Sequence, residues 1–172
     1  ANQGFNFGGL ASNSSDMFAI NVDRNRYKEN FFPGTFNLTL QGPLGTIKLS
    51  DNSNNTTVIS YLDCGRVYDI VSGSNGLAAT TTNVGQIASG YTISGSYGLF
   101  LPDIGTLILN PRALELPLVN GGIGLTPTVT ANVNTPYTNV NNNLLYDAIK
   151  AGNYFQLNSQ ESVASDYIFV RV

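Results

Sequence analysis

The sequence predicts a mainly β fold: a single β-sandwich-like or β-rich α+β domain with one short helix near residues 143–151 and extended arms. Three observations lead to this class. Apolar and polar residues alternate over residues 36–49, which is the period of a half-buried strand. Residues 56–71 are rich in β-branched side chains and tyrosine. Residues 143–151 place apolar side chains at helical spacing.

The chain divides into an arm and one domain. Residues 1–15 are rich in Gly, Asn and Ser without periodicity, which predicts a flexible or partner-bound N-terminal arm before a single β-rich domain over residues 16–172. Apolar runs and alternation predict strands at residues 17–22, 35–41, 46–50, 56–62, 66–71, 90–110 (two strands around the turn LPDIG) and 166–172. The last of these, DYIFVRV, is apolar on both faces and is expected to be a central strand.

The strands around residues 42–45 form the clearest local unit. Phe36, Leu38 and Leu40 share one face of the first strand, whereas Asn37 and Thr39 are expected to point outward. The turn GPLG then leads into TIKLS, which repeats the alternation. This pattern predicts a β-hairpin.

The remaining segments are loops and one helix. Residues 24–34 indicate a polar turn or short helix, residues 72–90 a long surface loop, and residues 111–142 an irregular region in which Asn120-Gly121 is a hairpin signal. In the helix, one face carries Leu144, Leu145, Ala148 and Ile149. The asparagines at 141–143 offer N-caps, Lys150 suits the last turn, and Gly152 is expected at the C′ position.

Residues 63–76, DCGRVYDIVSGSNG, hold the densest set of reactive side chains. Cys64 and Arg66, between Asp63 and Asp69, have the composition of a reaction centre. A cysteine nucleophile needs an activating base, but the chain has no histidine. We therefore expect the end of one strand with a buried Cys64, a glycine turn, and a second strand on which Arg66 and Asp69 are partners at the edge.

Other catalytic and cofactor patterns are weak. The glycines of GSNG fit neither a dinucleotide loop nor a P-loop, because no lysine or helix follows. Asp51, Ser53 and Asn55 match the first calcium-loop positions, but the sixth and twelfth positions do not match, so an Asx-turn loop is expected. No recognisable glycosidase pair is formed by the carboxylates Asp63, Asp69, Asp103, Glu115, Asp147 and Glu161. The sequence therefore predicts no catalytic, cofactor-binding or metal-binding residues and no enzyme activity.

Charge limits the classes of partner. Charged residues make up 11% of the chain and the net charge is −3, whereas typical domains carry about 25% charged residues. The sequence has no basic stripe of the kind that indicates nucleic-acid binding, and it has no apolar run long enough for a membrane span. Low charge is typical of surfaces that lie against neighbouring subunits.

A glycan-binding module is an alternative hypothesis. Exposed tyrosines with abundant asparagine could stack on sugars and hydrogen-bond to them; the candidates are Tyr61, Tyr68, Tyr91, Tyr97 and Tyr137. Packing within the strands is the competing explanation for these tyrosines.

Four stretches together carry a family resemblance: YKENFFPGTFNLTL, GRVYDIVSGSNG, SYGLFLPDIGTLILN and LLYDAIKAGNYFQLNSQESVASDYIFVRV. Their order and spacing over about residues 16–172 resemble virion structural proteins of contractile-tailed bacteriophages, especially cyanophages and other marine phages. The resemblance implies a tail or baseplate component of the virion, assembled in the host cytoplasm, with a capsid or neck attachment protein as the alternative. The implied partners are other virion proteins and copies of itself. The family has no assigned reaction, so no functional residues follow from it.

Overall fold

The computed structural model describes residues 17–79, 97–127 and 140–165. In chain order, the elements are β1 (Phe18–Asn21), η1 (Arg24–Arg26), β2 (Asn30–Phe31), β3 (Asn37–Gly42), β4 (Gly45–Asp51), β5 (Ser60–Leu62), β6 (Gly65–Ser74), β7 (Leu77–Ala78), β8 (Gly98–Leu101), β9 (Thr106–Leu109), α1 (Pro111–Glu115), η2 (Leu118–Asn120), α2 (Val140–Gly152), β10 (Tyr154–Gln156) and β11 (Ser159–Gln160). The predicted N-terminal arm lies outside the described residues, as does the expected strand at 166–172.

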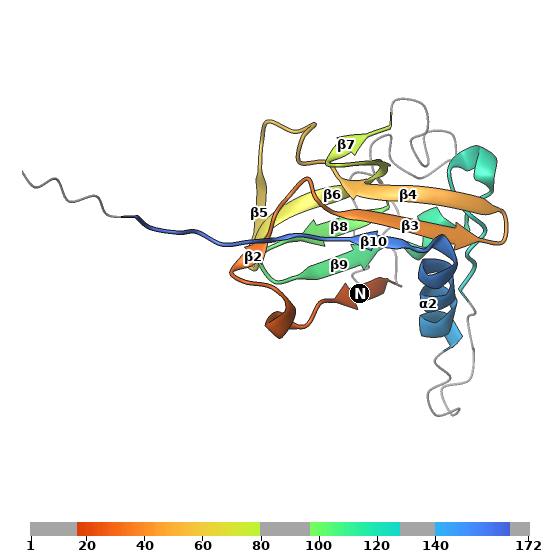
Figure 1. The fold of residues 1–172 in the computed structure, drawn as a ribbon. Coiled ribbons are helices and arrows are strands. Elements are labelled where there is room, and N and C mark those ends of the chain that lie inside the picture. Colours follow the sequence, from red (N-terminus) through yellow and green to blue (C-terminus); the bar gives the residue numbers. More distant parts are fainter. Residues whose placement is uncertain (1–16, 80–96, 128–139, 166–172) are drawn as a thin grey trace, which may run out of the picture.

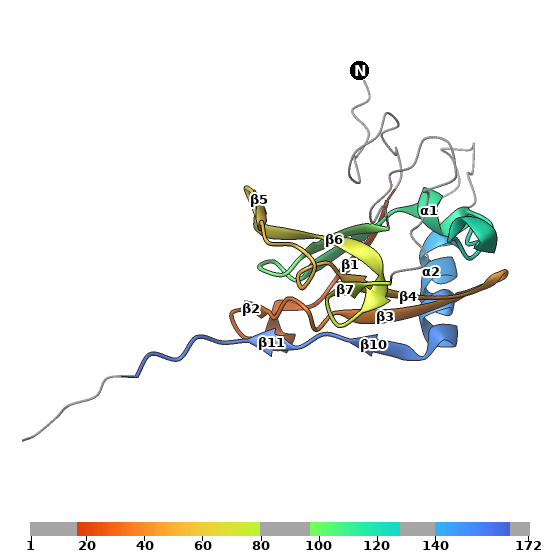
Figure 2. The same cartoon turned by 90° about the horizontal axis from the view of Figure 1, so that it is seen from above.

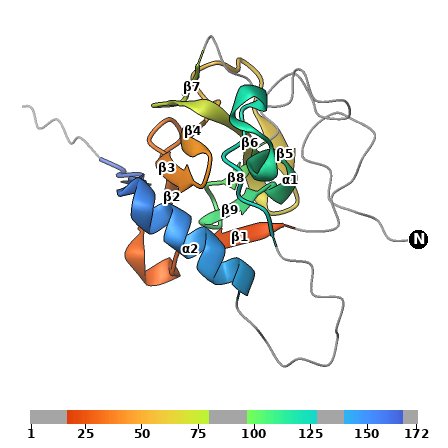
Figure 3. The ribbon, with the colours of Figure 1, turned by 90° about the vertical axis from the view of Figure 1, so that its right-hand side faces the viewer.

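Most of the described strands belong to one curled antiparallel sheet (Figure 1). Its order is β1-β9-β8-β6-β4-β3-β10, and β5 and β7 also pair with β6. The sheet folds over into two facing layers, with β6, β8 and β9 opposite β3 and β10 (Figure 2). The helices α1 and α2 lie across one end (Figure 3), and β5 and β2 lie at the other. The β-rich α+β fold class is therefore confirmed.

The core lies between the two layers. Phe36 and Phe100 stack from opposite sides with their ring centroids 5.6 Å apart, and Phe155 meets Phe36 edge-on at 6.3 Å. Fully buried aliphatic side chains surround these rings: Leu40, Leu49, Ile70, Leu107 and Leu109. Burying this apolar surface is the main driving force for closing the sheet on itself.

The β3–β4 hairpin is confirmed, with Leu38 opposite Leu49 and Leu40 opposite Ile47. One expectation within it is wrong, because Asn37 is buried rather than exposed. Its side-chain amide donates to Asn75 Oδ1 at 3.0 Å, and its Oδ1 accepts the Asn75 N–H at 2.8 Å. The turn after β6 covers this face of β3, and a pattern of alternating residues carries no information about that cover.

The predicted start of the loop at 72–90 is too early, because residues 72–78 belong to strands and their turn. β6 continues to Ser74 and returns as β7 through Asn75 and Gly76, which have φ values of 53° and 75°. Positive φ at both central residues is the type I′ hairpin turn that Asn-Gly favours. Residues 80–90 lie outside the described residues.

The region after β9 is more ordered than its prolines suggested. α1 begins at Asn110, whose side chain accepts the Arg112 N–H at 3.1 Å, and Pro111 takes the first helical position. Asn120-Gly121 is not a hairpin turn, since η2 ends there with Gly121 in the left-handed conformation at φ 80°. The following residues pack under α1, with the Ile123 N–H donating to Leu114 O at 3.0 Å.

The predicted helix is confirmed, but its ends differ. Its apolar face, with Leu145 and Ala148 buried, packs on β3. The asparagines at 141–143 lie inside the first turn rather than capping it. Asn153, at φ 54°, takes the left-handed position that was expected for Gly152. The described helices include none long and apolar enough to cross a membrane.

Gly152 tests the contact between α2 and the sheet. A Cβ at this position would lie 1.9 Å from the Thr39 carbonyl oxygen, so alanine would push the helix end off β3. We expect Gly152→Ala to lower the free energy of unfolding by about 1–3 kcal/mol despite the better helix propensity of alanine. Urea denaturation measures this change. The exposed neighbouring substitution Ala151→Ser is the control, and equal midpoints for both variants would contradict the close contact.

Candidate interaction surface

The outer edge of β5 is the most exposed apolar feature of the described sheet. β5 pairs with β6 through Ser60↔Val67, Tyr61↔Arg66 and Leu62↔Gly65, and no other described strand pairs with it. Four large apolar side chains on and just before β5 are exposed: Val58 by 74%, Ile59 by 44%, Tyr61 by 68% and Leu62 by 50%. We call these four residues the β5 surface.

A groove runs along one face of β5. Val58, Ser60 and Leu62 line it on one side, and residues of β6 and β8, including Tyr68 and Leu99, line it on the other. Its volume is about 220 Å³. Because an apolar cavity of about 150 Å³ can hold benzene, this groove is large enough for an aliphatic or aromatic side chain.

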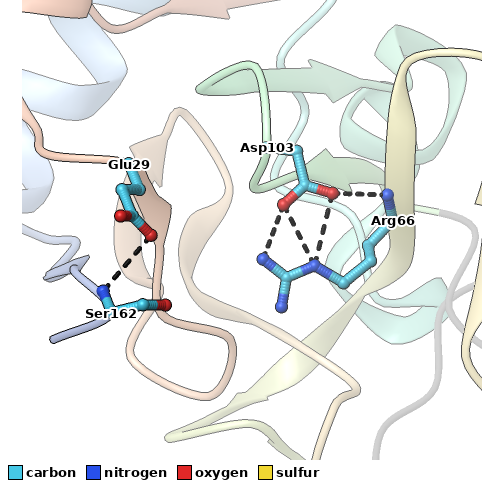
Figure 4. Close-up of polar contacts among 4 residues, drawn as sticks. All are labelled: Glu29, Arg66, Asp103 and Ser162. Atoms are coloured by element: carbon cyan, nitrogen blue, oxygen red, sulfur yellow. Dashed lines mark hydrogen bonds and ion pairs between the residues drawn. The ribbon is translucent and has the colours of Figure 1, made fainter. Parts of the chain in front are cut away.

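An ion pair holds the turn end of the β5–β6 hairpin (Figure 4). Asp103, in the turn between β8 and β9, accepts the Arg66 backbone N–H at 2.7 Å and its Nε and Nη2 at 3.0 and 2.5 Å. Gly65 permits this approach, since its φ is 112° and a Cβ there would lie 2.4 Å from Asp103 Oδ2. Burial raises the pKa of Asp103, but the hydrogen bonds and charge of Arg66 outweigh it and hold that pKa below its usual range.

The reaction centre suggested by residues 63–76 does not form. Arg66 binds Asp103 and not Asp69, which instead exchanges hydrogen bonds with Asn52 at 3.1 and 3.2 Å. Cys64 is half-buried rather than buried. Burial raises the pKa of Asp69, and the Asn52 hydrogen bond opposes this only in part. The Arg66 guanidinium is paired with the Asp103 carboxylate.

The residues that partly match a calcium loop form a turn, as expected from the sequence. Asp51 is fully buried and accepts the N–H groups of Gly34 at 2.9 Å and Ser53 at 3.0 Å. The Asn55 side chain accepts the Ala78 N–H at 2.6 Å. Asp51 therefore ties residues 51–53 to the loop before β3, and Asn55 ties the same segment to β7. Within the described ranges, no group of three or more His, Cys, Asp or Glu side chains could hold a metal ion.

The candidate carboxylates are scattered over the molecule. Asp103 and Asp69 have the partners given above, and Glu161 lies 3.7 Å from Lys28 Nζ. Asp63 and Asp147 are exposed, and Glu115 is half-buried.

The candidate glycan-binding tyrosines do not form one exposed surface among the described residues. Tyr68 and Tyr97 are buried, and Tyr97 donates its hydroxyl to Gly121 O at 2.7 Å in a site where burial raises its pKa. Tyr61 alone of the described candidates is exposed, and it belongs to the β5 surface. Tyr91 and Tyr137 lie outside the described residues.

Sequence reasoning missed a second, larger groove of about 470 Å³, lined by Asn37, Lys48, Ser74, Asn75 and Tyr154 among others. Its lining comes from separate strands and from the β6–β7 turn. The Asn75-Gly76 dipeptide was the local signal for that turn.

The C-terminal arm, residues 157–165, is the second part of the candidate surface. β11 pairs with β2, and the Phe32 N–H donates to Asn158 O at 2.9 Å. Glu29 accepts the Ser162 N–H at 3.2 Å, which is the last of these contacts along the arm (Figure 4). Residues 161–165 are exposed and lead away from the domain at the β5 end (Figures 1 and 2).

The Arg66–Asp103 pair predicts a pH-dependent stability. Because the folded-state pKa of Asp103 is lowered, the stabilisation is present above its unfolded-state pKa of about 3.9 and is lost as the pH falls through the folded value. We expect Asp103→Asn to cost about 1–2 kcal/mol at neutral pH, and this cost should shrink in acid. Urea denaturation across the pH range measures it. Asp63→Asn, an exposed neighbour, is the control; a cost for Asp103→Asn that does not change with pH would contradict the ion pair.

No protein-family model, curated protein or solved structure matches this chain.

Proposed function

We propose that this chain is a non-enzymatic structural subunit of a bacteriophage particle that joins neighbouring subunits in the tail or baseplate. The observation that carries the proposal is the β5 surface, where four large apolar side chains are exposed along a sheet edge that has no strand partner among the described residues. The C-terminal arm leaves the domain at the same end (Figure 1). The partners are other virion proteins and copies of the chain itself.

The β5 edge lacks charged residues and proline, two of the features that keep natural sheet edges apart, although its length of three residues is itself such a feature. Natural edge strands are protected by lysine, proline, bulges or a covering loop, because free N–H and C=O groups can pair with another chain. The segment TTVISYL, residues 56–62, contains no charged residue and no proline. An edge of this kind supports a role in which a neighbouring subunit covers it.

The composition supports the same role. The chain has only three Lys and three Glu in 172 residues, and the cores of protein interfaces are depleted in these residues. The residues first considered for catalysis or calcium binding make structural contacts: Arg66 with Asp103, Asp69 with Asn52, and Asp51 with two backbone N–H groups. The sequence resemblance to virion proteins of contractile-tailed phages supports a location in the particle.

The proposal predicts self-association of the full chain. Sedimentation velocity over a concentration series should show species larger than the monomer, because the β5 surface would be buried between copies. A chain that remains monomeric at about 100 µM would have a self-association free energy weaker than about −5.5 kcal/mol and would contradict this part of the proposal.

The location in a particle is tested separately. Gold-labelled antibodies against the chain should decorate the tail or baseplate of purified phage in electron micrographs. Labelling of the capsid or neck would correct the position, and purified particles that lack the chain would overturn the role in the virion.

A further inference from the structure

We infer that the β5 surface accepts residues 166–172, DYIFVRV, of a second copy of this chain as an added strand. This inference deepens the proposed function, on which it rests, by naming the partner and the segment that it contributes. Strand addition uses main-chain hydrogen bonds for affinity and alternate side chains for specificity.

The donor segment has the pattern of a strand covered on both faces. Tyr167, Phe169 and Arg171 alternate with Ile168, Val170 and Val172, so both faces are largely apolar. A segment of this kind needs a neighbouring strand and apolar cover to leave water. It directly follows the exposed residues 161–165, which lead away from the domain (Figures 1 and 2).

The acceptor offers both requirements. The outer edge of β5 has no strand partner among the described residues, so its backbone groups can extend the sheet. The exposed side chains of the β5 surface would lie beside alternate side chains of an added strand and give them apolar cover. Seven residues in extended conformation span about 23 Å, more than enough to follow residues 58–62.

The placement of the two parts favours a second copy over the same chain. The arm is held on β2 by the β11 pairing and by Glu29, in the layer opposite β5 (Figure 2). It then leaves the domain instead of turning toward β5. Because the described part of the arm leaves the domain at the β5 end, two copies that face each other can exchange strands reciprocally, as in an isologous dimer.

β5 is a better acceptor than the terminal strand β10. Phe155 of β10 already packs against Phe36 in the core. β10 exposes two large apolar side chains, Tyr154 at 52% and Phe155 at 42%, whereas the β5 surface exposes four, by 44–74%. The exposed apolar area that a new strand could cover is therefore larger at β5.

Disulfide trapping between two differently tagged chains tests the inference. In a Cys64→Ser background, one chain carries Tyr61→Cys and the other Val170→Cys; the mixture is oxidised and analysed by mass spectrometry. We expect a covalent heterodimer. The control replaces Tyr61→Cys with Val119→Cys, which is at least as exposed (82%) but lies in η2 at the other end of the domain, and this control should form little heterodimer.

A second experiment measures self-association of variants that carry no introduced cysteine. Removing residues 166–172, or the substitution Leu62→Lys, should weaken self-association by at least about tenfold, since each removes one side of the buried contact. Val119→Lys is the matched control. The midpoint of urea unfolding of each variant verifies that the domain still folds.

The outcomes separate the inference from the proposed function. Self-association that survives the deletion, without the Tyr61→Cys heterodimer, overturns the inference and leaves the assembly role standing. A chain with both Tyr61→Cys and Val170→Cys that forms only an internal disulfide also overturns it, because the strand would then return to its own domain. A full chain that never self-associates contradicts both.

Discussion

The backbone ladder along β6 is the constraint on which the rest of the structure depends. This ten-residue strand pairs with β5, β8, β4 and β7 at successive positions from Gly65 to Ser74. Its side chains Ile70 and Val71 are buried on opposite faces, so the middle of the strand lies inside the domain. Because one rigid strand carries four neighbours, the position of β5 is fixed by the core itself.

Neutral polar side chains form the main hydrogen bonds beside the β3–β4 hairpin and the β6–β7 turn. Ser50 is fully buried; its hydroxyl donates to Phe36 O at 2.7 Å and accepts the Gly76 N–H at 2.8 Å. Asn37 and Asn75 bind each other beside it. A buried N–H or C=O without a partner costs free energy comparable to a lost hydrogen bond, and these side chains supply the partners. A few neutral side chains thus satisfy backbone groups inside the domain without the help of charged residues.

The β5 surface differs from this well-satisfied interior. The domain buries the apolar side chains of its central strands but leaves the four large apolar side chains of the β5 surface exposed to water at one edge. Within a single copy, that arrangement gains nothing from the hydrophobic effect. Covering the edge with a strand from a neighbour would complete the sheet, and the ion pair between Arg66 and Asp103 would hold the acceptor in place before the partner arrives. Such preorganisation lowers the entropy that binding must overcome.

The sequence by itself determined the local units. Alternation at Phe36, Leu38 and Leu40 was enough for the β3–β4 hairpin, and the spacing of Leu145 and Ala148 was enough for α2, because burial of one face imposes these periods on neighbouring residues. Asn75-Gly76 and Asn110-Pro111 also carried local turn and helix-start signals, but sequence reasoning missed both and predicted a loop and an irregular region there. Only the tertiary structure decided that Arg66 meets Asp103, 37 positions away, and that Asn37 is buried. The β-branched run at 56–62 likewise predicted a strand but not an open edge, because exposure depends on which segments lie beside it in space.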